Sequence, residues 1–201
     1  MRAKLLLIGI AVPLLLGLVI AVAGLASASG NVPTARLTQL VLRANEIPGY
    51  VPKPPAPKPL GLAAFLSAVD APPSQRAILA QAGFVHGAVE TLKPPVAVPA
   101  GAPSESAVAL LGSPAKARAA LPKILSTLPP PPGPGFKVVH FRIPGVPGSA
   151  AKVTSKGPVD VYNVFFTAGP YVYNVDAATA NGRLSRAQFI EAIKAYYQRV
   201  K

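Results

Sequence analysis

The sequence predicts an α+β protein, with an antiparallel β-sheet of about five strands and helices packed mainly on one face, after an N-terminal signal or anchor helix. Three observations favour this class. Apolar residues recur at helical spacing after the leader and again at the end of the chain, β-branched and aromatic runs lie between them, and Gly and Pro bound each run. The predicted order after the first helices is β-β-α-β-β-β-α.

The first residues predict export. Arg2 and Lys4 precede an apolar run over residues 5–25, and a tract of small residues ending at Ser29 follows. Two interpretations stay open: residues 1–28 are a signal peptide cleaved after Ala28, or an uncleaved membrane anchor that leaves the remainder outside. Residues 29–201 are then one exported α+β domain. The chain has no cysteine, which excludes a lipid-modified cysteine and disulfides.

The first third of the domain is predicted to be helical. A helix over 34–46 has one apolar face and ends before Pro48, and a second spans 61–70. A third begins near Ser74 and ends at Gly83, a common helix-terminating residue.

Proline sets the loops of the domain. Two dense clusters among the 25 prolines of the chain, at 51–59 and 129–135, cannot form a helix or an inner strand. We expect both to be loops or stiff spacers within one domain, with no domain boundary at either.

The rest of the chain predicts strands around one helix. Residues 84–92 and 106–111 read as two strands, and Ser113 followed by Pro114 predicts the start of a helix. Three more strands are predicted farther along the chain, the last two joined as a hairpin by Ala168-Gly169-Pro170, over 136–143, 159–167 and 171–177.

The last helix has the strongest start signal. Ser185 and Gln188 match a capping box, and Leu184 and Phe189 match a hydrophobic staple. We expect this helix to cover one face of the sheet with the apolar side chains of Phe189, Ile193, Tyr196, Tyr197 and Val200.

The domain is strongly basic. The chain has 20 Lys and Arg against 7 Asp and Glu, so removing Arg2 and Lys4 with the leader leaves 18 against 7, a net charge of +11. The basic residues are scattered, which argues against a nucleic-acid partner. Attraction to an envelope component such as anionic lipid or a wall polymer is one interpretation, and an ordinary solvated surface is the other.

No residue pattern predicts catalysis, a cofactor or a metal site. Ser113 and Lys116 match the S-x-x-K pattern of penicillin-recognising serine enzymes, but the S-D-N and K-T-G motifs are missing and helix capping explains Ser113. His86 and His140 are too few for a zinc site, even with Glu90 on the same strand as His86, and we expect these side chains to face solvent. A serine hydrolase therefore remains a minor alternative, and we expect no enzyme.

Aromatic residues gather in the last hairpin, where Tyr-Asn-Val occurs twice, at 162–164 and 173–175. They favour a core layer, but the alternative is a pocket for a small apolar ligand between the sheet and the last helix. Its candidate lining residues are Tyr162, Phe165, Tyr171, Tyr173, Phe189, Ile193 and Tyr196.

The segments 42–50 and 165–173 resemble those of small exported bacterial envelope proteins of unknown function, including lipoproteins and sensor-like domains of α+β type. The resemblance implies an envelope location and no enzymatic activity. It carries over no functional residue. The sequence therefore predicts an exported cell-envelope protein with a non-enzymatic binding or accessory role, and a carrier of a small apolar ligand as the alternative.

Overall fold

The computed structural model describes residues 34–98, 102–130, 133–180 and 182–201, so the predicted leader at 1–28 lies outside the described residues. The described elements are, in chain order, α1 (Thr34–Leu37), β1 (Val51–Pro52), α2 (Leu62–Ala68), α3 (Ser74–Gln81), β2 (His86–Lys93), β3 (Ser104–Leu110), α4 (Pro114–Ser126), β4 (Lys137–Phe141), β5 (Ala150–Lys156), β6 (Val159–Ala168), β7 (Tyr171–Ala180) and α5 (Arg186–Val200).

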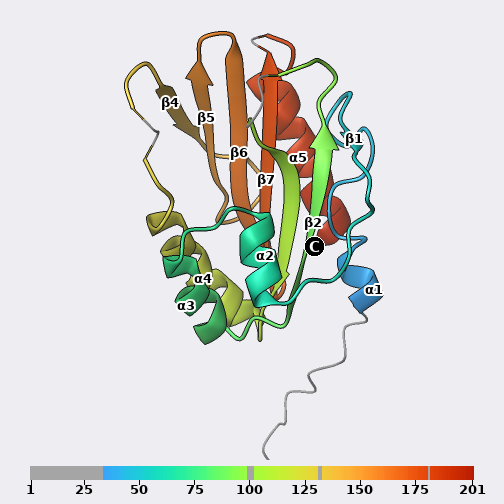
Figure 1. The fold of residues 1–201 in the computed structure, drawn as a ribbon, viewed down its shortest axis with the longest axis vertical. Coiled ribbons are helices and arrows are strands. Elements are labelled where there is room, and N and C mark those ends of the chain that lie inside the picture. The colour runs from blue at the N-terminus through green and yellow to red at the C-terminus, as the bar shows by residue number, and fades with distance from the viewer. Residues whose placement is uncertain (1–33, 99–101, 131–132, 181) are drawn as a thin grey trace, which may run out of the picture. The chain divides into compact units, whose positions relative to one another are not determined.

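The strands form one antiparallel sheet in the order β1-β2-β3-β7-β6-β5-β4 (Figure 1). This sheet of seven strands corrects the prediction of about five. The unpredicted strands are β1, a two-residue edge strand within the first Pro-rich segment, and β5, which is rich in Ala and Lys. Proline is tolerated at a sheet edge. Pairing with β4 and β6 forms β5 despite its weak intrinsic preference.

Helices cover both faces of the sheet, which corrects the expectation of one main face. Figure 1 shows α2 in front of the sheet and α5 behind it. One buried cluster joins α5 and the segment around Leu42 to the rear face, and a second joins α2, α3 and α4 to the front face. The physical reason is visible in β3, where consecutive residues from Ser106 to Leu110 are buried on both faces. Such a continuous apolar run is typical of a strand covered on both sides.

The N-terminal segment is a strap instead of the helix predicted over 34–46. Helix α1 ends at Leu37, and Asn45 adopts the left-handed backbone conformation, with φ of 62°, that a continuing helix forbids. We call residues 38–50 the strap. Its apolar side chains are nevertheless buried, and the Leu42 backbone N–H donates a 3.1 Å bond to the Ser106 hydroxyl on β3.

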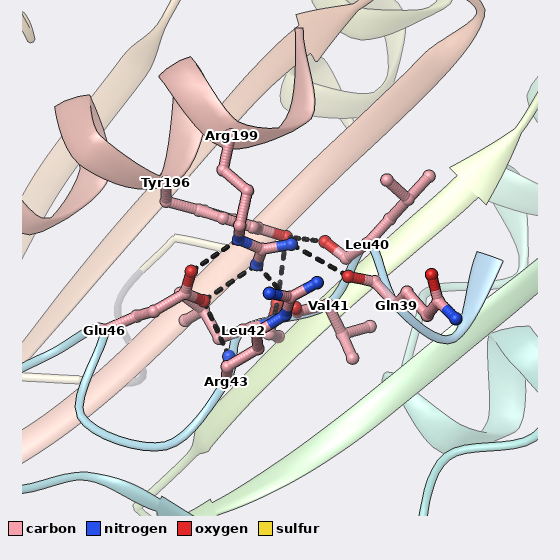
Figure 2. A network of polar contacts seen from close by, with 9 residues as sticks. Gln39, Leu40, Val41, Leu42, Arg43, Glu46, Tyr196 and Arg199 are labelled. Carbon is pink, nitrogen blue, oxygen red and sulfur yellow. Dashed lines mark hydrogen bonds and ion pairs between the residues drawn. The ribbon is translucent and has the colours of Figure 1, made fainter. Parts of the chain in front are cut away.

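Arg199 on α5 fastens the strap to the rear face (Figure 2). Its guanidinium donates to the carbonyl oxygens of Gln39 and Val41, each at 2.8 Å, and forms an ion pair with Glu46. The Tyr196 hydroxyl donates to the Leu40 carbonyl at 2.6 Å. We call these contacts of Arg199 and Tyr196 the clasp. They hold the strap against the C-terminal helix α5.

The predicted capping box at the start of α5 is confirmed. The Ser185 hydroxyl accepts from the Gln188 backbone N–H, and the Gln188 side chain accepts from the Ser185 N–H. The predicted apolar stripe faces the rear of the sheet, where Phe189, Ile193 and Tyr196 are almost fully buried.

Candidate functional site

Six of the seven predicted pocket residues meet on the rear face, where they form a packed layer. The Tyr162 ring stacks on Phe189 with 5.0 Å between centroids, and Tyr173 contacts Tyr196 edge-on at 5.8 Å. Tyr171 adjoins Tyr173, and Ile193 is fully buried among these rings. A ligand pocket here stays a prediction, and it would require these rings to separate.

Phe165 lies apart from the other six residues, on the front face. Side chains alternate between faces along β6, so Tyr162, Val164 and Phe166 face α5 while Phe165 contacts the helices opposite. Phe165 lines a cleft there. That cleft is the candidate site.

The residues that the sequence analysis weighed for catalysis or metal binding do not form a site in the structure. The Ser113 hydroxyl accepts a 3.2 Å bond from the Lys116 backbone N–H, as expected of the N-cap of α4. His140 is exposed and Glu90 is buried on β2, which corrects the expectation that Glu90 faces solvent. Among the described residues, no group of three or more His, Asp or Glu side chains is placed to hold a metal ion.

The cleft lies between the front face of the sheet and a wall of helices and loops, with a volume of about 350 Å³. Its helical wall is mostly apolar and includes Phe65, Leu79 and Ile124. The second Pro-rich segment contributes Pro129 and Pro130 to the rim. The sheet side combines apolar and polar side chains: Ala107, Ala109, Lys152, Thr154, Val161, Asn163, Phe165, Val172, Asn174 and Asp176.

A polar network occupies the sheet side of the cleft. The Asn163 side-chain amide donates to Asn174 Oδ1 at 3.0 Å and to Asp176 Oδ1 at 2.7 Å. The Asn174 amide donates to Asp176 Oδ2 at 2.7 Å. The network therefore holds the Asp176 carboxylate in a fixed orientation, because two amides on neighbouring strands bind its two oxygens.

Glu105 and Asp70 are two further carboxylates near this end of the cleft. Glu105 is its direct partner across β3 and β7, so the two side chains share the front face. Asp70, just after α2, lines the mouth of the cleft. Burial, followed by the charges of Asp176 and Asp70, raises the pKa of Glu105 to about 7. Burial also raises the pKa of Asp176, against the opposing effect of the Asn163 and Asn174 hydrogen bonds and of Lys152.

A second hollow of about 380 Å³ continues the cleft toward β4. The two share the wall residues Leu128, Pro129 and Pro130, together with Lys152 and Asn163 on the sheet. Val138 and His140 on β4 line the far end. The front face thus offers a groove that runs from Asp176 across β6 and β5 to the edge of the sheet.

The sequence contains one signal that marks these residues. The middle residue of each Tyr-Asn-Val repeat, Asn163 and Asn174, is a polar residue on a strand otherwise rich in apolar residues. Each Tyr and Val of the repeats faces the rear core, so each Asn faces the front. The repeat is visible in the sequence, but nothing in the sequence predicts a function for its asparagines.

No family model and no curated protein matches the sequence. Among solved structures, the chain is similar to the extracellular domain of PknH from Mycobacterium tuberculosis, with a TM-score of 0.55 and 14% identity. The match covers 84% of this chain and 96% of that chain. It shows a common fold over most of both chains. The chain therefore shares its fold with an extracellular domain.

Within the described residues, none of the helices has the length and apolar content needed to cross a membrane. The apolar run at 5–25, which carries the predicted signal or anchor, lies outside those residues.

Proposed function

We propose that this protein acts outside the cytoplasm as a non-enzymatic binding protein, and that the front cleft is where it binds a small molecule. The observation that carries the proposal is the cleft itself. It combines an apolar wall with a fixed polar network in a volume typical of small-molecule sites. The core of the rear face is filled by side chains instead.

Three considerations favour binding over catalysis. No serine lines the described part of the cleft, and the chain has no cysteine. Ser113 serves as a helix cap. The cleft asparagines bond to one another and to Asp176, an arrangement that orients polar groups for recognition.

Export is supported by the leader pattern at residues 1–28 and by the fold, which is also that of an extracellular domain. Cell fractionation of the native host, with mass spectrometry of the amino terminus, tests it. We expect the protein in the envelope or medium, beginning at Ser29 if the leader is cleaved. Recovery of the unprocessed chain from the cytosol would contradict export.

Binding in the cleft can be tested with 1-octanol as a neutral apolar probe. The protein is taken in the form that its native host accumulates, and methyl resonances of Ile124, Val161 and Val172 report on the cleft by NMR. We expect 1-octanol to shift these resonances, and Val161→Trp to abolish the shifts at Ile124 and Val172 by filling the cleft.

The matched control is Val85→Trp, which adds the same bulk at an exposed apolar residue. It should leave 1-octanol binding unchanged. Shifts confined to rear-face residues, or binding that Val161→Trp leaves intact, would contradict the proposed site.

A further inference from the structure

The carboxylates of this basic protein are unevenly distributed. All 7 lie within the described residues, against 18 Lys and Arg. Glu46 pairs with Arg199, and Glu191 pairs with Lys194. Of the others, Asp70 and Asp176 line the front cleft, and Glu105, which is not among the lining residues, is the direct cross-strand partner of Asp176. The cleft is therefore a concentration of negative charge on a positively charged molecule.

Positive charge does not cancel this concentration. Lys152 is the one cationic side chain among the described lining residues of the cleft, and it acts on Asp176. The two carboxylates of the lining, Asp70 and Asp176, outnumber it. Burial is the largest cause of the raised pKa of Glu105, and the charges of Asp176 and Asp70 raise it further, so these carboxylates lie close enough to repel one another.

We propose that the ligand of the front cleft is an amphipathic organic cation, whose ammonium group lies beside Asp70 and Asp176, with Glu105 adding its charge as the cross-strand partner of Asp176, and whose apolar body packs on the helical wall. This inference rests on the proposed function and specifies its ligand class. The cation adds the charge that these carboxylates lack, and the apolar body uses the surface of Phe65, Ile124 and Val172.

The hydrogen-bonding groups at this end favour a ligand rich in donors. Both amide hydrogens of Asn163 are used within the network, which directs its remaining capacity to the side-chain oxygen, an acceptor. Ionised carboxylates accept only. An ammonium group donates and carries the complementary charge, whereas a carboxylate or phosphate would meet acceptors and like charge.

The spacing of the carboxylates points to an organic cation over a bare metal ion. The described Asp, Glu and His side chains do not form a group of three that could hold a metal. A substituted ammonium group is larger, and it does not require ligands at the short distances of a metal centre. The adjoining apolar wall provides a surface that a metal ion would not use.

Three probes with the same number of carbon atoms test this inference: n-octylamine, 1-octanol and n-octanoate. Near pH 8 they are cationic, neutral and anionic, respectively. Affinities are measured by calorimetry. We expect n-octylamine to bind about ten-fold more tightly than 1-octanol, as one well-placed ionic interaction allows. We expect n-octanoate to bind most weakly.

Neutral variants locate the cation. Glu105→Gln and Asp70→Asn should each weaken n-octylamine binding several-fold and leave 1-octanol binding unchanged. Asp70 has a positive φ of 44°, a conformation that Asn tolerates, so this variant should fold normally. Lys152→Met should tighten n-octylamine binding, because it removes the opposing charge.

The matched control is Asp160→Asn, which removes one negative charge from the opposite face of the same sheet, since Asp160 shares its face of β6 with Tyr162 and Val164. It should leave all three affinities unchanged. Equal affinities for n-octylamine and 1-octanol, or tightest binding of n-octanoate, would overturn the cation inference while leaving a cleft that binds apolar molecules. If no probe binds and Val161→Trp changes nothing, the proposed function fails as well.

Discussion

The Glu105 side chain links the cleft to folding stability. Its pKa is about 7 in the folded protein, against an ordinary value of 4.5, because burial and the charges of Asp176 and Asp70 disfavour the ionised form. The folded state therefore binds more protons than the unfolded state between these values. The free energy of unfolding should fall as pH rises from about 4.5 to about 7.

Glu105→Gln should remove most of this pH dependence. At pH 8 we expect the variant to be more stable than the parent by about 2 kcal/mol, with little difference below pH 4.5, where Glu105 is protonated in both states. Urea denaturation across this pH range measures it. An unchanged pH profile in the variant would show that Glu105 is not the group responsible.

The Gly87 backbone determines how closely α2 approaches the sheet. A Cβ atom at this position would overlap the Phe65 ring, which lines the cleft. Gly87→Ala should cost about 1–3 kcal/mol of unfolding free energy, as overpacking in a core does. It should also alter 1-octanol affinity, because Phe65 must move.

A double variant tests whether the overlap between a Cβ atom at position 87 and the Phe65 ring causes this cost. Phe65→Leu shortens the side chain that meets the new methyl group, so Gly87→Ala should cost less in that background. Equal costs of Gly87→Ala in both backgrounds would contradict the contact as the cause.

At the scale of elements, the clasp between α5 and the strap is the interaction that joins the two ends of the domain. Arg199 and Glu46 are mostly buried, with side-chain exposures of 20% and 21%. Arg199→Met should cost about 3 kcal/mol of unfolding free energy, because it leaves Glu46 and two carbonyl groups without their partner. It should also speed amide hydrogen exchange in the strap.

Two substitutions control for charge and for helix position. Lys194→Met removes the exposed ion pair with Glu191 on the same helix, and should cost less than about 1 kcal/mol. Arg199→Lys keeps the charge but cannot reach the carboxylate and both carbonyls, so it should recover only part of the loss. A cost for Arg199→Met no larger than for Lys194→Met would show that the clasp adds little.

Elements with local signals were predictable from the sequence. The capping box of α5 involves residues three apart and is decided within one helical turn. The strap was not predictable from the sequence, because its apolar residues recur at helical spacing. Its conformation depends on hydrogen bonds to β3 and α5, which are far away in the sequence. Strand β5 likewise depends on partners on both sides.

The cleft was harder to predict than any element. Its acidic end joins Asp70 after α2 to Glu105 on β3 and Asp176 on β7. Only the order of strands in the sheet brings these residues together. In the sequence these three carboxylates lie far apart, so no local pattern predicts that they meet. Six of the seven candidate pocket residues lie together in the rear core, and Phe165 lies on the front face.

At the scale of the whole molecule, the decisive feature is a sheet covered on both faces. A single covered face would leave the other to solvent and produce alternating apolar and polar residues. Residues are buried consecutively along β3 and in parts of β6 and β7, which departs from that alternation. The likeness to an extracellular domain at 14% identity shows that this arrangement tolerates very different sequences.

The net charge of +11 after the leader predicts long-range attraction to anionic surfaces, in contrast to the local charge of the cleft. We propose that the processed protein sediments with vesicles containing anionic lipid. Scattered Lys and Arg act together through such a field, and salt screens it over about 10 Å at 0.1 M. Binding should therefore fall steeply as salt rises toward 0.5 M.

Vesicles of neutral lipid provide the control, since they have the same apolar interior without the surface charge. We expect little sedimentation with them at any salt concentration. Octylamine binding in the cleft should change less with salt than vesicle binding, because closely spaced charges in a partly enclosed site are screened less than separated surface charges. Equal sedimentation with neutral and anionic vesicles would show that the basic side chains do not attract the protein to anionic surfaces. Any envelope partner must then be recognised by other groups.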